Sequence, residues 1–463
     1  MNKALNPLER SWLMLESPAT PAHFGALLTF SLPAAAPRGY VGQLVERLRA
    51  ECACVAPWNL RLNRKLRFLP RWEEEQQPDM EYHVRHSAMP APGGERELGV
   101  LVSRLHSHPL DMSRPLWECH LIEGLHDGQY AIYFKMHHAL TDVASLLRML
   151  TAWLSADPQQ REAPAPWTLT STASELHSAG ERLQASMRSF IQRGEVVSSA
   201  TDLGRAFTRL LRKGTKKDSA LRAPYRAPHS ALNVRIDAQR RFATQQYQRA
   251  RLQRVAEACA ISLDELVLYL CGSALRRFFK EYNALPEQPF IAALPGLRKG
   301  QDGEAGEAPY GSIAFVSLGT QFADPHKRMT EVHRSVQASR EHLDAVPESM
   351  IPLYTLLTAT PYLLSQVSGV RRLLPAMFSL VIADQAGPEQ LLYCNGAELK
   401  SLYPMFPLLQ GAALSITCLH YADTLNIGIC GARETLPSLQ RMAVYMGQAL
   451  ADLEEALTEG AAS

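Results

Sequence analysis

The sequence predicts an α/β (α+β) fold of two domains, each mixing strands with helices. The chain has 463 residues, of which 46% are hydrophobic, so it can bury more than one hydrophobic core. Strand-like and helix-like patterns alternate in both halves, and a segment rich in Pro, Ser, Thr, Ala, Arg and Lys separates them. We predict an N-terminal domain over 1–160, a partly helical crossover linker over 161–232 and a C-terminal domain over 233–463.

Local patterns predict the elements of the N-terminal domain. Apolar, β-forming segments bounded by Gly, Pro and Asp are typical of strands, and apolar residues spaced three and four apart are typical of helices. Strands are expected at 23–32, 116–123 and 129–136, and helices at 40–52, 98–106 and 141–154. The short spacing between the last two strands predicts a hairpin.

The C-terminal half carries the same mixture of signals. Ser262 followed by Glu265 forms a capping box, which predicts the start of a helix. Strands are expected at 290–294, 313–318, 414–419 and 425–430, and a final helix near Pro437-Ser438. Both halves therefore favour a pseudo-duplicated architecture.

The linker has two features of its own. An apolar helical face is formed by Leu176, Leu183, Met187 and Phe190. A basic cluster follows, which consists of Arg209, Arg212, Lys213, Lys216 and Lys217. One interpretation is a solvated linker end, and the other is contact with anionic lipid headgroups.

Composition argues against several classes of protein. The formal net charge is only +2, so a basic groove for nucleic acid is not indicated. The eight cysteines are scattered without zinc-ligand spacing, which favours a reducing, cytoplasmic setting and no metal site. Glu9 and Arg10 interrupt the apolar character of the N-terminus, and the apolar stretch 24–37 is broken by prolines. It falls short of the roughly 20 residues that cross a bilayer, so any membrane contact is expected to be peripheral.

Two adjacent histidines lie between the predicted strand 129–136 and the predicted helix 141–154. Neighbouring side chains on an extended chain point in opposite directions, so either His137 or His138 can enter a cleft while the other packs behind it. Asp142 opens the helix, where a carboxylate suits the helix dipole. An imidazole can accept the proton of an attacking alcohol and return a proton to a thiolate leaving group. Alone, the pair is also compatible with a structural role, whereas metal binding lacks a third ligand.

The surrounding blocks identify a family resemblance. The run 136–143 resembles the HHxxxDG motif of the wax ester synthase/diacylglycerol acyltransferase family, within the coenzyme A-dependent acyltransferase superfamily. Further blocks similar to the family follow in its order: 7–12, 16–23, 109–111, the PLW block at 114–118, Gly387-Pro388, Asn395-Gly396-Ala397 and Tyr403-Pro404. The resemblance covers nearly the whole chain.

The resemblance implies two chloramphenicol-acetyltransferase-like domains with mixed sheets and an active-site tunnel between them. By it, His138 matches the catalytic base and His137 the supporting histidine. Asp142 matches an aspartate that usually pairs with an arginine, for which Arg298 is the candidate.

The sequence departs from the family at three places. Val143 stands where the motif has glycine, and valine adds bulk beside His138. The family's Asn-Asp pair is Leu263-Asp264 here, and its SNVPGP block retains only Gly387-Pro388. We take Val143, Asp264, Gly387 and Pro388 as candidate substrate-binding residues.

We therefore expect an O-acyltransferase that moves a long-chain acyl group from acyl-CoA to a diacylglycerol or a fatty alcohol. Acyl-CoA is a substrate, and no cofactor is expected. The expected location is the cytoplasm, at the inner membrane face or at lipid inclusions. Two alternatives stay open: a non-catalytic member that binds lipid inclusions, and a condensation-type acyltransferase that uses a carrier protein. The choice of acceptor and the oligomeric state stay open as well.

Overall fold

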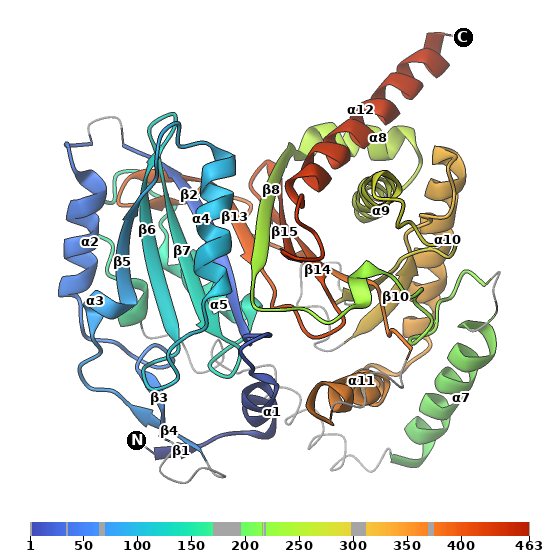
Figure 1. The fold of residues 1–463 in the computed structure, drawn as a ribbon, viewed down its shortest axis with the longest axis horizontal. Coiled ribbons are helices and arrows are strands. Elements are labelled where there is room, and N and C mark those ends of the chain that lie inside the picture. Colours follow the sequence, from blue (N-terminus) through green and yellow to red (C-terminus); the bar gives the residue numbers. More distant parts are fainter. Residues whose placement is uncertain are drawn as a thin grey trace.

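The computed structural model describes residues 2–33, 36–63, 70–169, 196–214, 216, 219–297, 312–368 and 375–462. Two mixed six-stranded sheets stand side by side, one in each half of the molecule, beside a small three-stranded sheet (Figure 1). The predicted α/β fold with mixed sheets is confirmed.

The N-terminal sheet contains two strands from the C-terminal half of the chain. Its strands, in spatial order, are β12 (Tyr393–Cys394), β13 (Ala397–Met405), β2 (His23–Ser31), β7 (Gln129–His137), β6 (Trp117–Leu125) and β5 (Val84–Ala88). β13 runs antiparallel to β2, and β5 runs parallel to β6. The crossing of β13 joins the two halves through backbone hydrogen bonds.

Helices cover both faces of this sheet. Alternate residues of a strand point to opposite faces. On one face they pack with α2 (Tyr40–Ala50), α3 (Met80–His83) and α5 (Val143–Trp153). On the other they pack with α4 (Glu95–Ser107), which also contacts the C-terminal sheet through β8.

The C-terminal sheet has a parallel centre and antiparallel edges. Its strands, in spatial order, are β10 (Ile313–Ser317), β9 (Ile291–Pro295), β11 (Leu380–Gln385), β14 (Leu414–Tyr421), β15 (Thr424–Ala432) and β8 (Arg240–Gln248). β9, β11 and β14 are parallel. The helices packed with this sheet are α8 (Arg249–Ala258), α9 (Leu263–Glu281), α10 (Pro325–Asp344) and α12 (Gln440–Ala462). The predicted capping box of Ser262 and Glu265 is confirmed at the start of α9.

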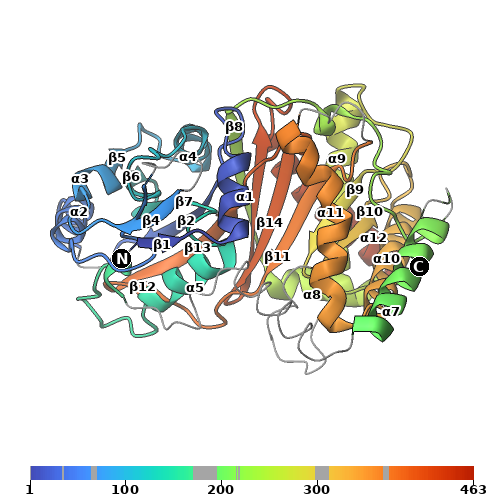
Figure 2. The ribbon, with the colours of Figure 1, turned by 90° about the horizontal axis from the view of Figure 1, so that it is seen from below.

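The underside of the molecule carries α1 (Pro7–Leu15), α11 (Ile351–Ser368) and α7 (Val196–Gly214) (Figure 2). The small sheet consists of β1 (Asn2–Ala4), β4 (Arg71–Glu74) and β3 (Leu60–Asn63). Short 3-10 helices occur at Pro166–Thr168, Ala231–Asn233 and Glu348–Met350. The predicted helical face of Leu176, Leu183, Met187 and Phe190 lies outside the described residues, as do Lys217 and Arg298.

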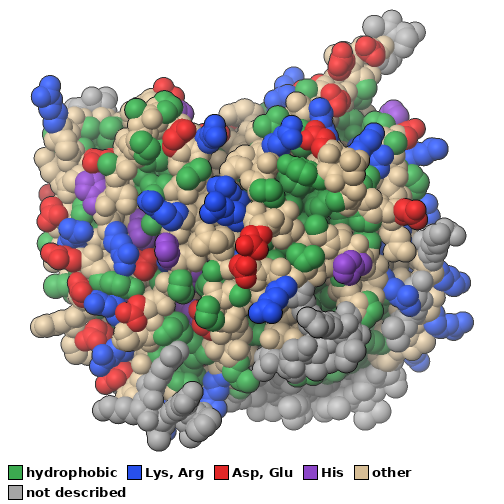
Figure 3. Space-filling model, viewed as in Figure 1, with side chains coloured by type: hydrophobic (Ala, Val, Ile, Leu, Met, Phe, Trp, Pro, Cys, Tyr) green, Lys and Arg blue, Asp and Glu red, His purple; other side chains and the backbone are tan. Residues whose placement is uncertain are grey.

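Positive and negative side chains are interspersed on the face seen in Figure 3. Within the described ranges, no single helix has the length and apolar composition of a bilayer-spanning segment, and α8 with α9 reaches them only as a pair bent by 92°.

Candidate active site

The two histidines lie where β7 ends and the chain turns into α5. The His137 N–H donates to the carbonyl oxygen of Leu116 at 3.0 Å, and the His138 N–H donates to that of Ala22 at 2.9 Å. These bonds continue the pairing of β7 with β6 and β2, so the position of His138 is set by backbone on both sides. Leu116 belongs to the PLW block, whose buried Trp117 stacks on Trp167.

His137 is held in one tautomer. Its Nδ1 accepts the N–H of Ala139 at 2.9 Å, so the ring proton is on Nε2. Nε2 then donates to Oε2 of Glu16, 3.3 Å away. His137 is 1% exposed, so it supports the turn from within the core.

Glu16 connects both histidines. The same Oε2 that accepts from His137 also accepts the backbone N–H of Ala22. The carbonyl of Ala22 in turn accepts the N–H of His138. One carboxylate oxygen therefore positions His137 directly and His138 through one residue of backbone. Sequence reasoning missed this role, although Glu16 lies in one of the blocks that resemble the family.

The ring of His138 lies between two aromatic rings. Trp12 stacks on it with centroids 4.2 Å apart, and Phe24 contacts it at 4.7 Å. Burial lowers the pKa of His138 to about 3, while the nearby Asp142 carboxylate acts in the opposite direction. The imidazole is therefore neutral near pH 7 and can accept a proton. The residue as a whole keeps an intermediate exposure.

Asp142 and Val143 begin α5. The Asp142 carboxylate accepts the N–H of Ser145 at 2.7 Å, which caps the helix. Val143, 3% exposed, belongs to the hydrophobic core that α5 forms with the N-terminal sheet. Its bulk lies within this core, where a glycine would leave empty space.

The helix that carries Trp12 is anchored by its own sequence. Asn6 and Glu9 form a capping box at the start of α1. The second carboxylate bond of Glu9 comes from the indole N–H of Trp72 in β4, at 3.1 Å. Because β4 also pairs with β1, the small sheet holds α1 beside the histidines.

The other candidate residues lie elsewhere, in the C-terminal domain. Asp264, at the start of α9, pairs with Arg340 at 3.3 Å and lines a small, mostly apolar pocket at the carboxyl ends of the parallel strands. His420 lines this pocket as well, and Gly387 packs so tightly on its carbonyl that no Cβ would fit. The Pro388 carbonyl accepts the N–H of Ala422. His420 thus lies near both residues: it shares the pocket with Asp264, and its carbonyl packs against Gly387. A role for Asp264, Gly387 or Pro388 in substrate binding stays a prediction.

The NGA block is a turn. Asn395 and Gly396 both have positive φ, 51° and 78°, between the paired strands β12 and β13. This is the geometry of a two-residue type I′ hairpin, for which Asn-Gly is the preferred sequence. The Asn395 side chain also accepts the N–H of Ala163 at 2.8 Å, which ties the start of the linker to the hairpin.

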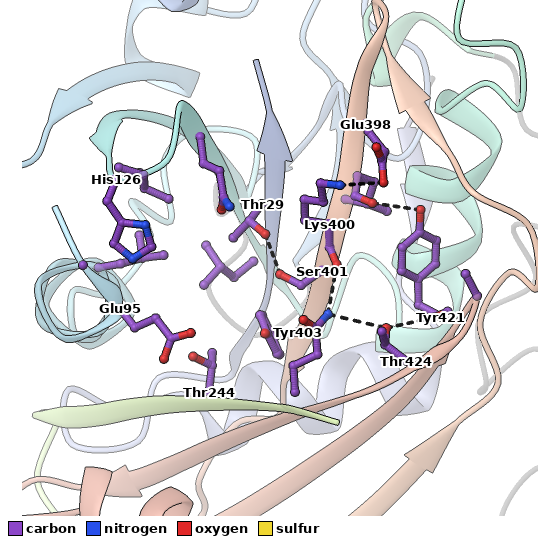
Figure 4. A pocket seen from close by; sticks show the side chains of 18 of the residues that line it. Thr29, Glu95, His126, Thr244, Glu398, Lys400, Ser401, Tyr403, Tyr421 and Thr424 are labelled. Atoms are coloured by element: carbon purple, nitrogen blue, oxygen red, sulfur yellow. Dashed lines mark hydrogen bonds and ion pairs between the residues drawn. The ribbon is translucent and has the colours of Figure 1, made fainter. Parts of the chain in front are cut away.

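A cavity of about 410 Å³ opens between the two sheets at the opposite end of β2 and β7 (Figure 4). Thr29 and Gln129 line it, whereas His23 and His137 are paired at the other end. His23 and Thr29 are six residues apart on β2, which corresponds to about 20 Å along the strand. Its lining mixes polar and apolar side chains, with Glu95 and Lys400 among the charged ones. His138 does not line it, and the tunnel to His138 stays a prediction.

Comparison with known proteins places this arrangement in a family. Residues 5–267 match the model of the wax ester synthase/diacylglycerol acyltransferase catalytic domain, and 311–454 match that of the WS/DGAT C-terminal domain. A Mycobacterium tuberculosis protein named as a diacylglycerol O-acyltransferase is 37% identical, with 99% of this chain and 98% of that protein covered.

Solved structures support the same family assignment. The wax ester synthase/diacylglycerol acyltransferase from Marinobacter aquaeolei VT8 superposes with a TM-score of 0.78 at 33% identity, covering 98% of this chain and 100% of the other. The first condensation domain of the calcium-dependent antibiotic synthetase has a TM-score of 0.57 at 16% identity, covering 99% and 96%, and shares the fold. The chain therefore belongs to the wax ester synthase/diacylglycerol acyltransferase family and is an acyltransferase.

Proposed function

We propose that this protein transfers a long-chain acyl group from acyl-CoA to the hydroxyl of a diacylglycerol or a fatty alcohol, with His138 as general base. The observation that carries the proposal is the placement of His138, whose ring lies between Trp12 and Phe24 and whose backbone is held by a neighbouring strand, in surroundings where burial lowers its pKa to about 3. A neutral imidazole held in place can accept a proton without first losing one.

The proposed reaction needs no cofactor. The alcohol oxygen attacks the thioester carbonyl carbon while its proton passes to a nitrogen of His138. The C–S bond then breaks, and the imidazolium returns the proton to the coenzyme A thiolate. The products are a triacylglycerol or a wax ester and free coenzyme A. Base catalysis of this kind contributes about 10²–10⁴-fold in rate.

We further propose that the protein works in the cytoplasm at a membrane or inclusion surface. Both acceptors and the long-chain product are poorly soluble in water, so they are present at lipid surfaces. The basic side chains Arg212 and Lys213, which are exposed on α7, support this location.

The test is the release of free coenzyme A from palmitoyl-CoA in the presence of hexadecanol or dipalmitoylglycerol. We expect His138→Ala to lower the rate by about 10²–10⁴-fold. His229→Ala, which removes an exposed histidine, serves as the matched control and should keep the rate. Chromatography of products from labelled acyl-CoA identifies the acceptor. Equal rates for His138→Ala and the native chain would contradict the role of His138, and no turnover by either would favour the non-catalytic alternative.

A further inference from the structure

We propose that the underside of the molecule is a docking face for an anionic phospholipid surface. The docking face consists of Leu356, Leu357 and Leu364 on α11, Met14 on α1, and Arg212 and Lys213 on α7. This inference rests on the proposed function, which needs water-insoluble substrates, and it names the surface through which they are met.

The apolar part of the docking face is the outer side of α11. This 18-residue helix contains no charged residue. Leu356, Leu357 and Leu364 are 39%, 48% and 61% exposed, while Ile351 and Tyr354 are buried on the opposite side. The described residues include nine exposed large hydrophobic side chains, and three of them are on this helix, so apolar exposure is concentrated here. An uncharged helix with one apolar face in solvent is a surface that needs a partner.

The apolar surface continues to the candidate active site. α1 contacts α11, and its Met14 is 66% exposed. Trp12, two residues earlier on α1, stacks on His138. A lipid surface that met α11 and the end of α1 would therefore lie next to the element that covers the reactive imidazole.

A helix with exposed basic side chains packs against the helix that carries the leucines. Phe207 of α7 packs edge-on against Tyr354 of α11, with ring centroids 5.3 Å apart. α7 exposes Arg212 and Lys213 in its last turn, whereas Arg209 lies 3.8 Å from Glu341 of α10. A helix with exposed cations that packs against an exposed apolar helix has the two components of interfacial helices, in which apolar side chains enter the lipid and basic ones meet phosphate. This charge favours anionic phospholipid over a neutral surface.

The experiment is flotation of the full-length protein with vesicles of phosphatidylcholine alone or mixed with phosphatidylglycerol. We expect the native chain to bind the mixed vesicles in a salt-sensitive manner. Leu357→Glu/Leu364→Glu should weaken this binding at least about tenfold, because charged side chains would have to enter the lipid. Arg212→Glu/Lys213→Glu should weaken it by a similar factor, since each basic side chain contributes about fivefold. Val444→Glu, at a 56% exposed apolar position on α12, is the matched control and should bind as the native chain does.

A second measurement separates docking from catalysis. With a short-chain acyl-CoA and a water-soluble alcohol, Leu357→Glu/Leu364→Glu should turn over within about twofold of the native chain, since these substrates do not require a surface. Unchanged vesicle binding by this variant would overturn the proposal. Loss of soluble turnover would overturn it too, because the leucines would then line the substrate site. A native chain that floats but turns over neither kind of substrate would contradict the proposed function and leave the docking face supported.

Discussion

Trp12 stacks on His138 with ring centroids 4.2 Å apart and ring planes inclined by 12°. The indole comes from the N-terminal helix and the imidazole from the end of a central strand, so a long-range contact shields one face of the imidazole. Shielding removes water, which disfavours the imidazolium and lowers the pKa of His138 to about 3. The proposed base is thereby kept in its unprotonated form.

Replacing Trp12 by alanine should change how activity depends on pH. Water would reach the ring, and the pKa of His138 would rise from about 3 toward the ordinary value of 6.5. Because the base works unprotonated, activity would then fall as pH decreases from about 7 to about 5.5, where the native chain stays active. The measurement is kcat/KM against pH.

Trp12→Phe is the matched control, since it keeps an aromatic ring over the imidazole. We expect the fall of its kcat/KM at low pH to follow that of the native chain. If kcat/KM of Trp12→Ala falls at the same pH as that of the native chain, the stacking does not determine the pKa of His138.

Glu16→Gln should lower kcat and leave KM nearly unchanged. The carboxylate accepts two hydrogen bonds that position both histidines, and bonds to a neutral amide are about half as strong. We expect kcat to fall about tenfold, as is common when a residue that orients a catalytic group is altered. Glu46→Gln, at an exposed glutamate on α2, is the control for steady-state kinetics. A rise in KM with unchanged kcat would point to substrate contact.

Val143→Gly restores the family's residue but should destabilise this chain. The valine side chain belongs to α5 and is buried in the core, and its removal should cost about 2–3 kcal/mol of the free energy of unfolding. Because the side chain is part of this core, we expect kcat/KM to stay within about threefold. Urea denaturation and kinetics on the same preparation measure both effects. A tenfold gain in kcat/KM would instead mean that valine narrows the path to His138.

Local signals were enough for the segment that carries the histidines. The hairpin predicted at 116–123 and 129–136 is β6 and β7, because alternating apolar residues and a glycine turn act within a few residues. β13 was not predicted, since its partner is β2 at the other end of the chain and Pro404 argues against a strand.

The same distinction applies to the site. His137, His138, Asp142 and Val143 are close in the structure because they are close in sequence. Trp12 could not be assigned to His138, because that contact depends on α1 packing beside the end of β7. The signal available in the sequence was the capping box of Asn6 and Glu9, which marks the start of a helix but not where the helix packs.

Buried histidines should make the fold sensitive to mild acid. Burial lowers the pKa of His83 to about 4, of His106 to about 3 and of His342 to about 4. Between these values and the ordinary 6.5, the unfolded chain binds protons that the folded chain does not. The contribution of these histidines to the free energy of unfolding is therefore fully present above about pH 6.5 and is lost as the pH falls below that value. At about pH 5.5 each of these histidines costs about 1.4 kcal/mol.

Urea unfolding at about pH 7.5, 6.5 and 5.5 measures this loss. Burial alone would raise the pKa of Glu118, but a hydrogen bond from His120 and the charge of Lys135 lower it to about 2. Glu118 does not contribute to the loss in this pH range, because a carboxyl in the unfolded chain takes up protons only near its ordinary pKa of 4.5. His342→Gln should reduce the loss between the highest and the lowest pH by about 1.4 kcal/mol. The exposed His229, changed to Gln, should not alter it. A free energy of unfolding that does not vary over this range would mean that the buried histidines are protonated in the folded chain.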